Sequence, residues 1–122
     1  MSEVKIILAA LWVCLMLTYL LGDVFRIFNG DFKPGEMAGK KATQSFWLLA
    51  AVIMLIPIIM VLLSLILPYD INRAINIIVA IFLALFNLSG LNGYPGLYDR
   101  FLIIVGIIFN LITIVYAIQW SL

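Results

Sequence analysis

The chain has 122 residues, of which 66% are hydrophobic and 11% are charged, and its formal net charge is +1. Soluble domains carry about 25% charged residues, so most of this surface must face lipid, and the small net charge gives no basis for binding nucleic acid. There is no histidine and one cysteine, Cys14, which excludes an intrachain disulfide, the usual zinc ligand sets and histidine-based catalysis. We therefore expect no catalytic, metal or cofactor site.

Four long runs without charge follow one another, at residues 6–22, 42–69, 74–98 and 101–122. A membrane-spanning helix needs about 20 residues, so each run is long enough for one crossing and too short for two. The first run also has the length of a signal peptide, but no small-residue cleavage site follows it, which favours a retained helix. The sequence thus predicts an all-α protein, a polytopic antiparallel bundle of four transmembrane helices, with residues 1–122 as one domain.

The first helix is expected over residues 4–28. A polar segment follows it and carries two turn pairs, Asn29-Gly30 and Pro34-Gly35. The second helix is expected over residues 43–67, with a threonine or serine near its start, Thr43 or Ser45, as the N-cap.

Pro57 lies near the middle of the second helix, where it removes one backbone hydrogen bond, so a kink is expected there. Asp70 is the expected N-cap of a third helix over residues 71–91. A tight turn at residues 92–96 leads to a fourth helix over residues 97–120. The last two connections are short, so these helices should be antiparallel neighbours.

Basic residues are distributed unequally between the two sides of such a bundle. The first and third loops carry five of them, whereas the remaining side carries two. The positive-inside rule then predicts a multi-pass protein of the cell membrane with both termini outside and the long first loop in the cytoplasm. The five are Arg26, Lys33, Lys40, Lys41 and Arg100, and the two are Lys5 and Arg73.

Charges also gather at one end of the predicted bundle. Asp23 and Arg26 close the first helix, and they share a helix face with Tyr19 because the spacings are four and three residues. Asp99 and Arg100 open the fourth helix on the same side. We expect an ionic cluster in which Asp23 pairs with Arg100 or Arg26 pairs with Asp99; the alternative is that each side chain reaches lipid headgroups or water by itself.

Small and neutral polar side chains recur at helical spacing within the uncharged runs. In the fourth helix they continue the face of Asp99 as far as Ala117, in alternating steps of four and three residues. Each helix has a comparable stripe, which should face the bundle interior. The candidate intramembrane polar stripe comprises Cys14, Thr18, Pro57, Asn76, Asn87, Asn110 and Thr113.

Two interpretations of this stripe are open. It either packs the helices together or lines a small-molecule pocket near the membrane midplane, floored by Cys14, Pro57 and Asn110. Cys14 has no basic neighbour to activate it, so it is expected to be a small buried side chain.

The second helix and the turn after it carry the most specific pattern, "IPIIMVLLSLILPYDINRAINII" at residues 56–78. This stretch resembles a domain-of-unknown-function family of small four-helix membrane proteins from bacteria and archaea, which is loosely similar to DoxX-like proteins. The opening "LAALWVCLMLTYLLGDVF", with Trp12 and Gly22-Asp23, resembles the first helix of that family. The resemblance implies a four-helix bundle, assigns no activity and carries over no quinone or redox residues.

Two functions are consistent with these observations. The first is an uncharacterised, non-enzymatic membrane protein that acts through helix packing and association with lipid, a second copy or another membrane protein; Ala80-x-x-x-Ala84 is a packing motif for such a copy. The alternative is a binder or transporter of a small apolar or lipid-like molecule in an intramembrane pocket. A small multidrug exporter is disfavoured because no carboxylate lies at mid-membrane.

Overall fold

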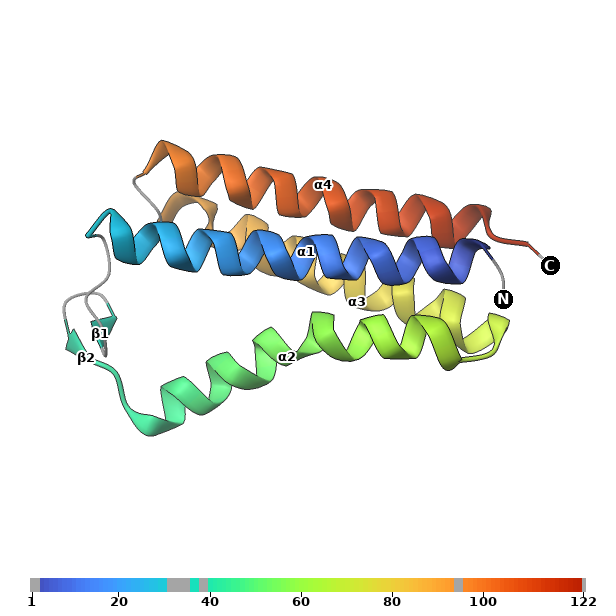
Figure 1. Ribbon diagram of the computed structural model, residues 1–122, viewed down its shortest axis with the longest axis horizontal. Helices are drawn as coiled ribbons and strands as arrows, with labels where there is room; N and C mark the ends of the chain where they lie inside the picture. The colour runs from blue at the N-terminus through green and yellow to red at the C-terminus, as the bar shows by residue number, and fades with distance from the viewer. Residues whose placement is uncertain (1–2, 31–35, 38–39, 94–95, 122) are drawn as a thin grey trace.

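The computed structural model describes residues 3–30, 36–37, 40–93 and 96–121, and within them four long helices form one bundle (Figure 1). The helices are α1 (Glu3–Phe28), α2 (Gln44–Ile66), α3 (Tyr69–Gly90) and α4 (Leu97–Gln119). A short 3-10 helix, Leu91–Gly93, follows α3, and two paired antiparallel strands, β1 (Glu36–Met37) and β2 (Lys40–Lys41), lie between α1 and α2.

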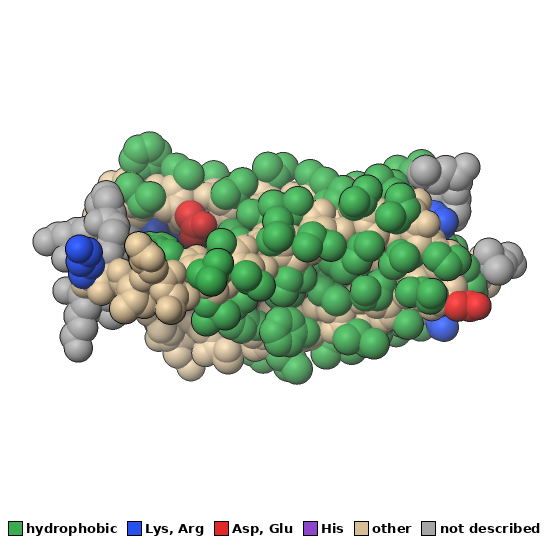
Figure 2. All heavy atoms as spheres, turned by 90° about the horizontal axis from the view of Figure 1, so that it is seen from below, with side chains coloured by type: hydrophobic (Ala, Val, Ile, Leu, Met, Phe, Trp, Pro, Cys, Tyr) green, Lys and Arg blue, Asp and Glu red, His purple; other side chains and the backbone are tan. Residues whose placement is uncertain are grey.

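Each of the four helices in the described ranges is long and apolar enough to cross a membrane. Figure 2 shows one flank of the bundle covered by hydrophobic side chains, with charged side chains toward its two ends. Successive helices run in opposite directions (Figure 1). The predicted all-α, antiparallel bundle of membrane-spanning helices is therefore confirmed.

Different segments of the chain lie at the two ends of the bundle. One end holds Glu3 of α1, the connection from α2 to α3, and Gln119 of α4, and is called the terminal end below (Figure 1). The opposite end holds Phe28 of α1, the strands β1 and β2, and Leu97 of α4, and is called the loop end.

Helix boundaries follow from local chemistry. Thr43 caps α2, because its Oγ1 accepts a hydrogen bond of 3.1 Å from the backbone nitrogen of Phe46. The predicted N-cap of α3, Asp70, is wrong: Pro68 occupies that position and its carbonyl accepts the first helical bond from Asn72, at 2.9 Å. The extended backbone at Pro68 sets this start, and Asp70 lies in the first turn, where a carboxylate still favours the helix dipole.

The connections contain one glycine that the backbone requires. Gly30 has a φ of 81° directly after α1, a left-handed conformation that glycine adopts without a steric penalty, and it forms the expected turn with Asn29. The expected turn at Pro34-Gly35 lies outside the described residues, as do Tyr94 and Pro95 of the turn before α4.

The second helix packs tightly only along its later half. No residue between Gln44 and Ile56 is buried, whereas Pro57, Met60 and Ser64 all are. Figure 1 shows α2 bent near its middle, with its first half leaning away from the other helices. Proline at this position removes a backbone donor and crowds the preceding turn, which accounts for the bend. The bundle is therefore closed at the terminal end and open at the loop end.

The core lies in the middle of the bundle and includes Trp12, Leu15, Met60, Ala80 and Leu83. Ala80 has no exposed surface, so it belongs to contacts within the chain. Of the Ala80-x-x-x-Ala84 motif, Ala80 thus packs inside the bundle, whereas Ala84 is half-buried. Small residues on α3 let its neighbours approach closely.

Candidate functional site

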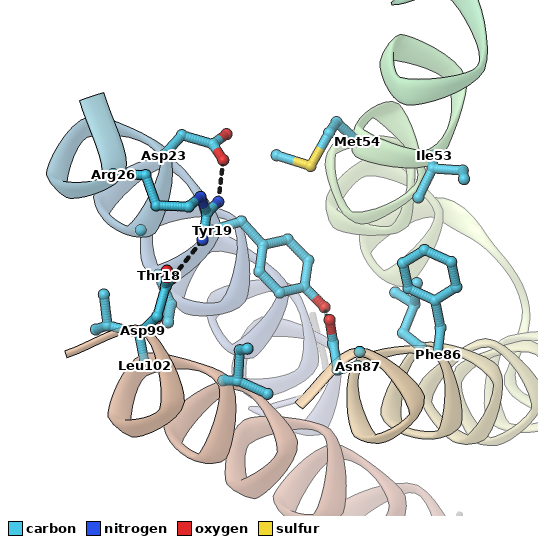
Figure 3. A pocket seen from close by; sticks show the side chains of 14 residues that line it. Thr18, Tyr19, Asp23, Arg26, Ile53, Met54, Phe86, Asn87, Asp99 and Leu102 are labelled. Atoms are coloured by element: carbon cyan, nitrogen blue, oxygen red, sulfur yellow. Dashed lines mark hydrogen bonds and ion pairs between the residues drawn. The ribbon is translucent and has the colours of Figure 1, made fainter. Parts of the chain in front are cut away.

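A cavity of about 200 Å³ opens between the helices at the loop end (Figure 3). It exists because the first half of α2 leans away from α1 and α3, leaving space that no side chain fills. Its polar lining comes mainly from α1 and the start of α4, and its apolar lining from α2, α3 and α4. The lining residues are Thr18, Tyr19, Gly22, Asp23, Arg26, Ile53, Met54, Leu83, Phe86, Asn87, Gly90, Asp99, Leu102 and Ile103.

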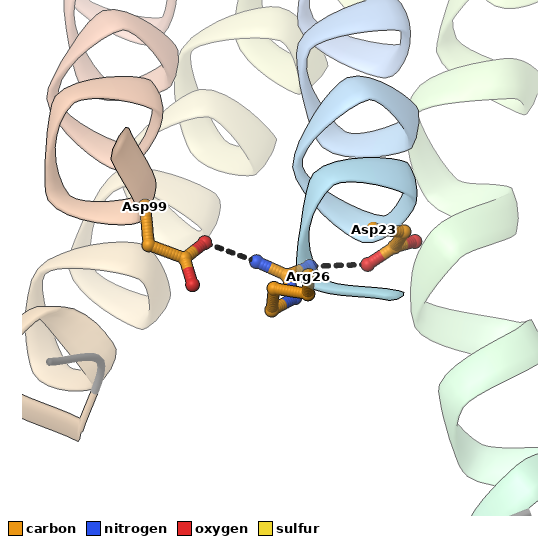
Figure 4. Close-up of polar contacts among 3 residues, drawn as sticks. All are labelled: Asp23, Arg26 and Asp99. Atoms are coloured by element: carbon orange, nitrogen blue, oxygen red, sulfur yellow. Dashed lines mark hydrogen bonds and ion pairs between the residues drawn. The ribbon is translucent and has the colours of Figure 1, made fainter. Parts of the chain in front are cut away.

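Three charged side chains form the polar rim of this cavity (Figure 4). Arg26 Nη1 donates to Asp99 Oδ1 at 2.5 Å, and Arg26 Nη2 donates to Asp23 Oδ1. The side chain of Asp99 is 2% exposed and that of Arg26 12%, whereas that of Asp23 is 49% exposed. One guanidinium thus joins α1 to α4, and two carboxylates with one guanidinium leave a formal charge of −1.

Of the two pairings that the sequence suggested, the structure shows the one between Arg26 and Asp99. Asp23 accepts from the same guanidinium. Arg100, the fourth residue of the expected cluster, is exposed and is not among the residues that line the cavity. The cluster therefore centres on Arg26.

The aromatic ring of Tyr19 forms the inner wall of the cavity and crosses from α1 toward α3 (Figure 3). Asn87 Nδ2 donates to the Tyr19 hydroxyl oxygen at 2.5 Å. The ring also packs beside Gly106 of α4, where a Cβ atom would lie 3.6 Å from Tyr19 Cε1, an ordinary van der Waals distance. The ring is thus held in place from two neighbouring helices.

With this geometry established, comparison with known proteins identifies the family. A family model described as DUF6326, a family of unknown function, matches residues 2–122. The chain belongs to the DUF6326 family. The resemblance to a domain-of-unknown-function family that the sequence indicated is confirmed. No curated protein and no solved structure matches the chain.

The polar stripe of this DUF6326 protein is only partly where the sequence placed it. On α4, Asn110 and Thr113 are buried, and on α2 and α3 Pro57 and Asn76 are buried as well. Asn87 is half-buried and lines the cavity. These residues face the bundle interior, as their spacing indicated.

The face of α1 is different from the predicted one. Cys14 is exposed, so the expectation that it is buried is wrong. Trp12 and Leu15 are buried instead, because the indole nitrogen of Trp12 donates to Asn76 Oδ1 at 2.6 Å. A residue two positions after Trp12 points to the opposite side of the helix. Thr18 lines the cavity, and its hydroxyl donates to the Cys14 carbonyl at 2.8 Å.

The expected pocket floored by Cys14, Pro57 and Asn110 is therefore wrong in position. The buried Pro57 and Asn110 pack within the bundle and do not line the cavity, which lies nearer the loop end. Its location follows from the bend of α2, which separates the helices only before Pro57.

Polar groups in the terminal half of the DUF6326 bundle are used for structure. Ser64 Oγ donates to Asn76 Oδ1 at 3.3 Å, Asn76 Nδ2 donates to Asn72 Oδ1 at 2.7 Å, and Asn72 Nδ2 donates to the Ser64 carbonyl at 2.8 Å. With Trp12, these side chains join α1, α2 and α3. Unsatisfied polar groups are costly in lipid, so this mutual satisfaction fixes the helices. Sequence reasoning missed Asn72, although it lies four residues before Asn76.

The end of α4 is fastened to the start of α3. Arg73 Nε donates to the Ala117 carbonyl at 2.9 Å, and its Nη2 donates to the Ile118 carbonyl at 3.1 Å. The Tyr69 hydroxyl donates to the Trp120 carbonyl at 2.7 Å. These donors satisfy carbonyl groups that a helix end leaves without intrahelical partners. The terminal end is thus tied together, while the loop end holds the cavity.

Proposed function

We propose that this DUF6326 protein is a non-enzymatic membrane protein that binds a small amphipathic molecule at the loop end of its bundle. The observation that carries the proposal is the cavity of about 200 Å³ with a polar rim and an apolar wall. Binding sites for small molecules are concave and mostly apolar, with a few placed polar groups. This cavity has that composition.

The two sides of the cavity suit the two parts of an amphipathic ligand. Arg26, Asp23 and the Tyr19–Asn87 pair present charged and polar groups on one side. Met54 and neighbouring side chains of α2 and α3 present an apolar surface on the other (Figure 3). The polar part of the ligand would contact α1 and its apolar part would lie along α2.

Native mass spectrometry after gentle extraction tests this proposal. We expect the wild-type protein to retain a small molecule in stoichiometric amount. Met54→Trp places a large side chain in the cavity and should abolish retention. Leu55→Trp is the matched control, because the adjacent Leu55 is 47% exposed and does not line the cavity. Bare wild-type protein, or equal retention by both variants, would overturn the proposal.

A further inference from the structure

We infer that the polar group recognised by the cavity is a cation, a protonated amine or a quaternary ammonium carried on an alkyl chain. This inference rests on the proposed function and names its ligand class. Three observations support it: the formal charge of the rim, the exposure of the Asp23 side chain, and the aromatic ring of Tyr19 beside Asp23.

The charge of the rim disfavours an anion. Among the described residues that line the cavity, Arg26 is the basic one, and each of its two terminal nitrogens donates to a carboxylate. Two carboxylates and one guanidinium give these three groups a formal charge of −1. In the low effective dielectric near a bundle interior, that charge is weakly screened and attracts a cation.

Exposure shows which of these groups a ligand would meet. The Asp23 side chain is 49% exposed, against 12% for Arg26 and 2% for Asp99. Arg26 donates to Oδ1 of Asp23, so the second carboxylate oxygen faces away from that bond (Figure 4). Asp23 is thus the ligand-facing group, and Arg26 is a positioning residue that holds it.

The ring of Tyr19 lies one helical turn from Asp23 on the same face of α1 and lines the same cavity. The hydrogen bond from Asn87 holds the hydroxyl end of the ring, leaving its face toward the cavity. Aromatic faces attract ammonium groups, and a carboxylate beside such a face is a suitable site for an alkylammonium ion. The alkyl chain would then extend along Met54 and Phe86.

Two sources can supply this chemistry: a membrane lipid with an amine or choline headgroup, or a free alkylammonium compound. The first test uses purified protein in a neutral maltoside detergent, titrated with decyltrimethylammonium, decanoate or decanol. We expect only decyltrimethylammonium to bind saturably and to raise the melting temperature. Decanoate or decanol binding at least as tightly would overturn the inference.

Variants of Asp23 test the charge directly. Asp23→Asn removes the excess charge and should weaken decyltrimethylammonium binding about fivefold, the upper range for a half-exposed ion pair. Asp70→Asn is the matched control, because Asp70 is exposed in the first turn of α3 at the opposite end, and should bind like wild type. Asp23→Lys should reverse the preference and bind decanoate. Unchanged preference in Asp23→Asn and Asp23→Lys would contradict the assignment.

Variants of Tyr19 test the ring. Tyr19→Phe keeps the aromatic face and should bind decyltrimethylammonium within about twofold of wild type, whereas Tyr19→Leu should weaken it about three- to fivefold. Melting temperatures without ligand report separately on the lost hydrogen bond with Asn87. Equal binding by both variants would exclude a role for the ring.

The source is resolved by reconstituting the protein in nanodiscs of phosphatidylglycerol alone or with phosphatidylethanolamine and repeating native mass spectrometry. A retained mass equal to the added phosphatidylethanolamine identifies the lipid source. A retained amine of other mass, carried through purification, identifies the free compound. A retained molecule without basic nitrogen leaves the proposed function standing and overturns this inference, while bare protein in both nanodiscs overturns both.

Discussion

Arg26 connects two helices through a charge pair whose acidic partner is almost fully buried. Breaking a buried pair from one side leaves an uncompensated charge, so Arg26→Met should lower the free energy of unfolding by about 3 kcal/mol. Adding Asp99→Leu should recover part of that loss. Arg100→Met is the control at an exposed neighbour and should change stability much less. Thermal unfolding of the purified variants measures each free energy of unfolding. If the effects of Arg26→Met and Asp99→Leu simply add in the double variant, the two side chains are not coupled.

Asn110 offers a second test at the scale of one side chain. Its Nδ2 atom is buried and makes no hydrogen bond of good geometry within the described part of the chain, although it lies near enough to the Tyr19 hydroxyl for a weak interaction. A buried donor without a well-formed hydrogen bond costs about 1–3 kcal/mol, so Asn110→Leu, which keeps the branched shape and the number of side-chain heavy atoms, should stabilise the protein by about 1 kcal/mol. Thr113→Val is the comparison, because the Thr113 hydroxyl already donates to the Phe109 carbonyl at 2.9 Å and has little to gain. A lower melting temperature for Asn110→Leu would refute this.

At the scale of the element, the bend of α2 creates the space for the cavity. Pro57→Ala would restore a backbone donor to the carbonyl of Ile53 and should straighten α2 toward α3. Spin labels at the exposed residues Gln44 and Ser89, with Cys14→Ala to remove the native thiol, should move closer together. Ligand retention should fall with the same change.

A second label pair serves as the control for this experiment. Ile66 and Tyr116 are exposed in the terminal half of the bundle, where the hydrogen-bond network of Asn76 and Asn72 fixes the helices. Their separation should not depend on residue 57. Unchanged distances in both pairs would mean that α2 bends for a reason other than its proline.

The helices differ in how far their inner faces follow from sequence. On α4 the small and polar residues Gly106, Asn110 and Thr113 are buried as their spacing indicates, because close helix approach needs small side chains. On α1 the same reasoning selected the face of Cys14 as the buried one. The hydrogen bond of Trp12 to its partner determines instead that the face of Trp12 is buried. That partner, Asn76, is 64 residues away, and helical periodicity contains no information on it.

The position of the cavity is likewise only partly predictable from the sequence. The charges that form its rim are visible in the sequence, because Asp23, Arg26 and Asp99 close and open helices on one side. The proline that bends α2 is visible too. The direction of the bend depends on how the later half of α2 packs through Met60 and Ser64, so the place where the helices separate follows only from the assembled bundle.

At the scale of the whole molecule, the orientation in the membrane decides which side the cavity faces. Five basic residues accompany the loop end and two the terminal end, so the loop end and its cavity should face the cytoplasm, with both termini outside. Single cysteines in a Cys14→Ala background test this at Gly93, in the short 3-10 helix at the loop end, and at Ser121, after α4.

An impermeant thiol reagent added to intact cells should label the Ser121→Cys variant and not the Gly93→Cys variant, because only the former would lie outside. Both positions are exposed, and both should react once the membrane is opened with detergent, which controls for accessibility. The numbers of basic residues on the two sides are five and two, and the double variant Lys40→Gln with Lys41→Gln would change them to three and two. This variant should therefore insert in both orientations and be labelled at both positions. Labelling of the Gly93→Cys variant alone in otherwise unaltered protein would place the cavity outside and reverse the orientation.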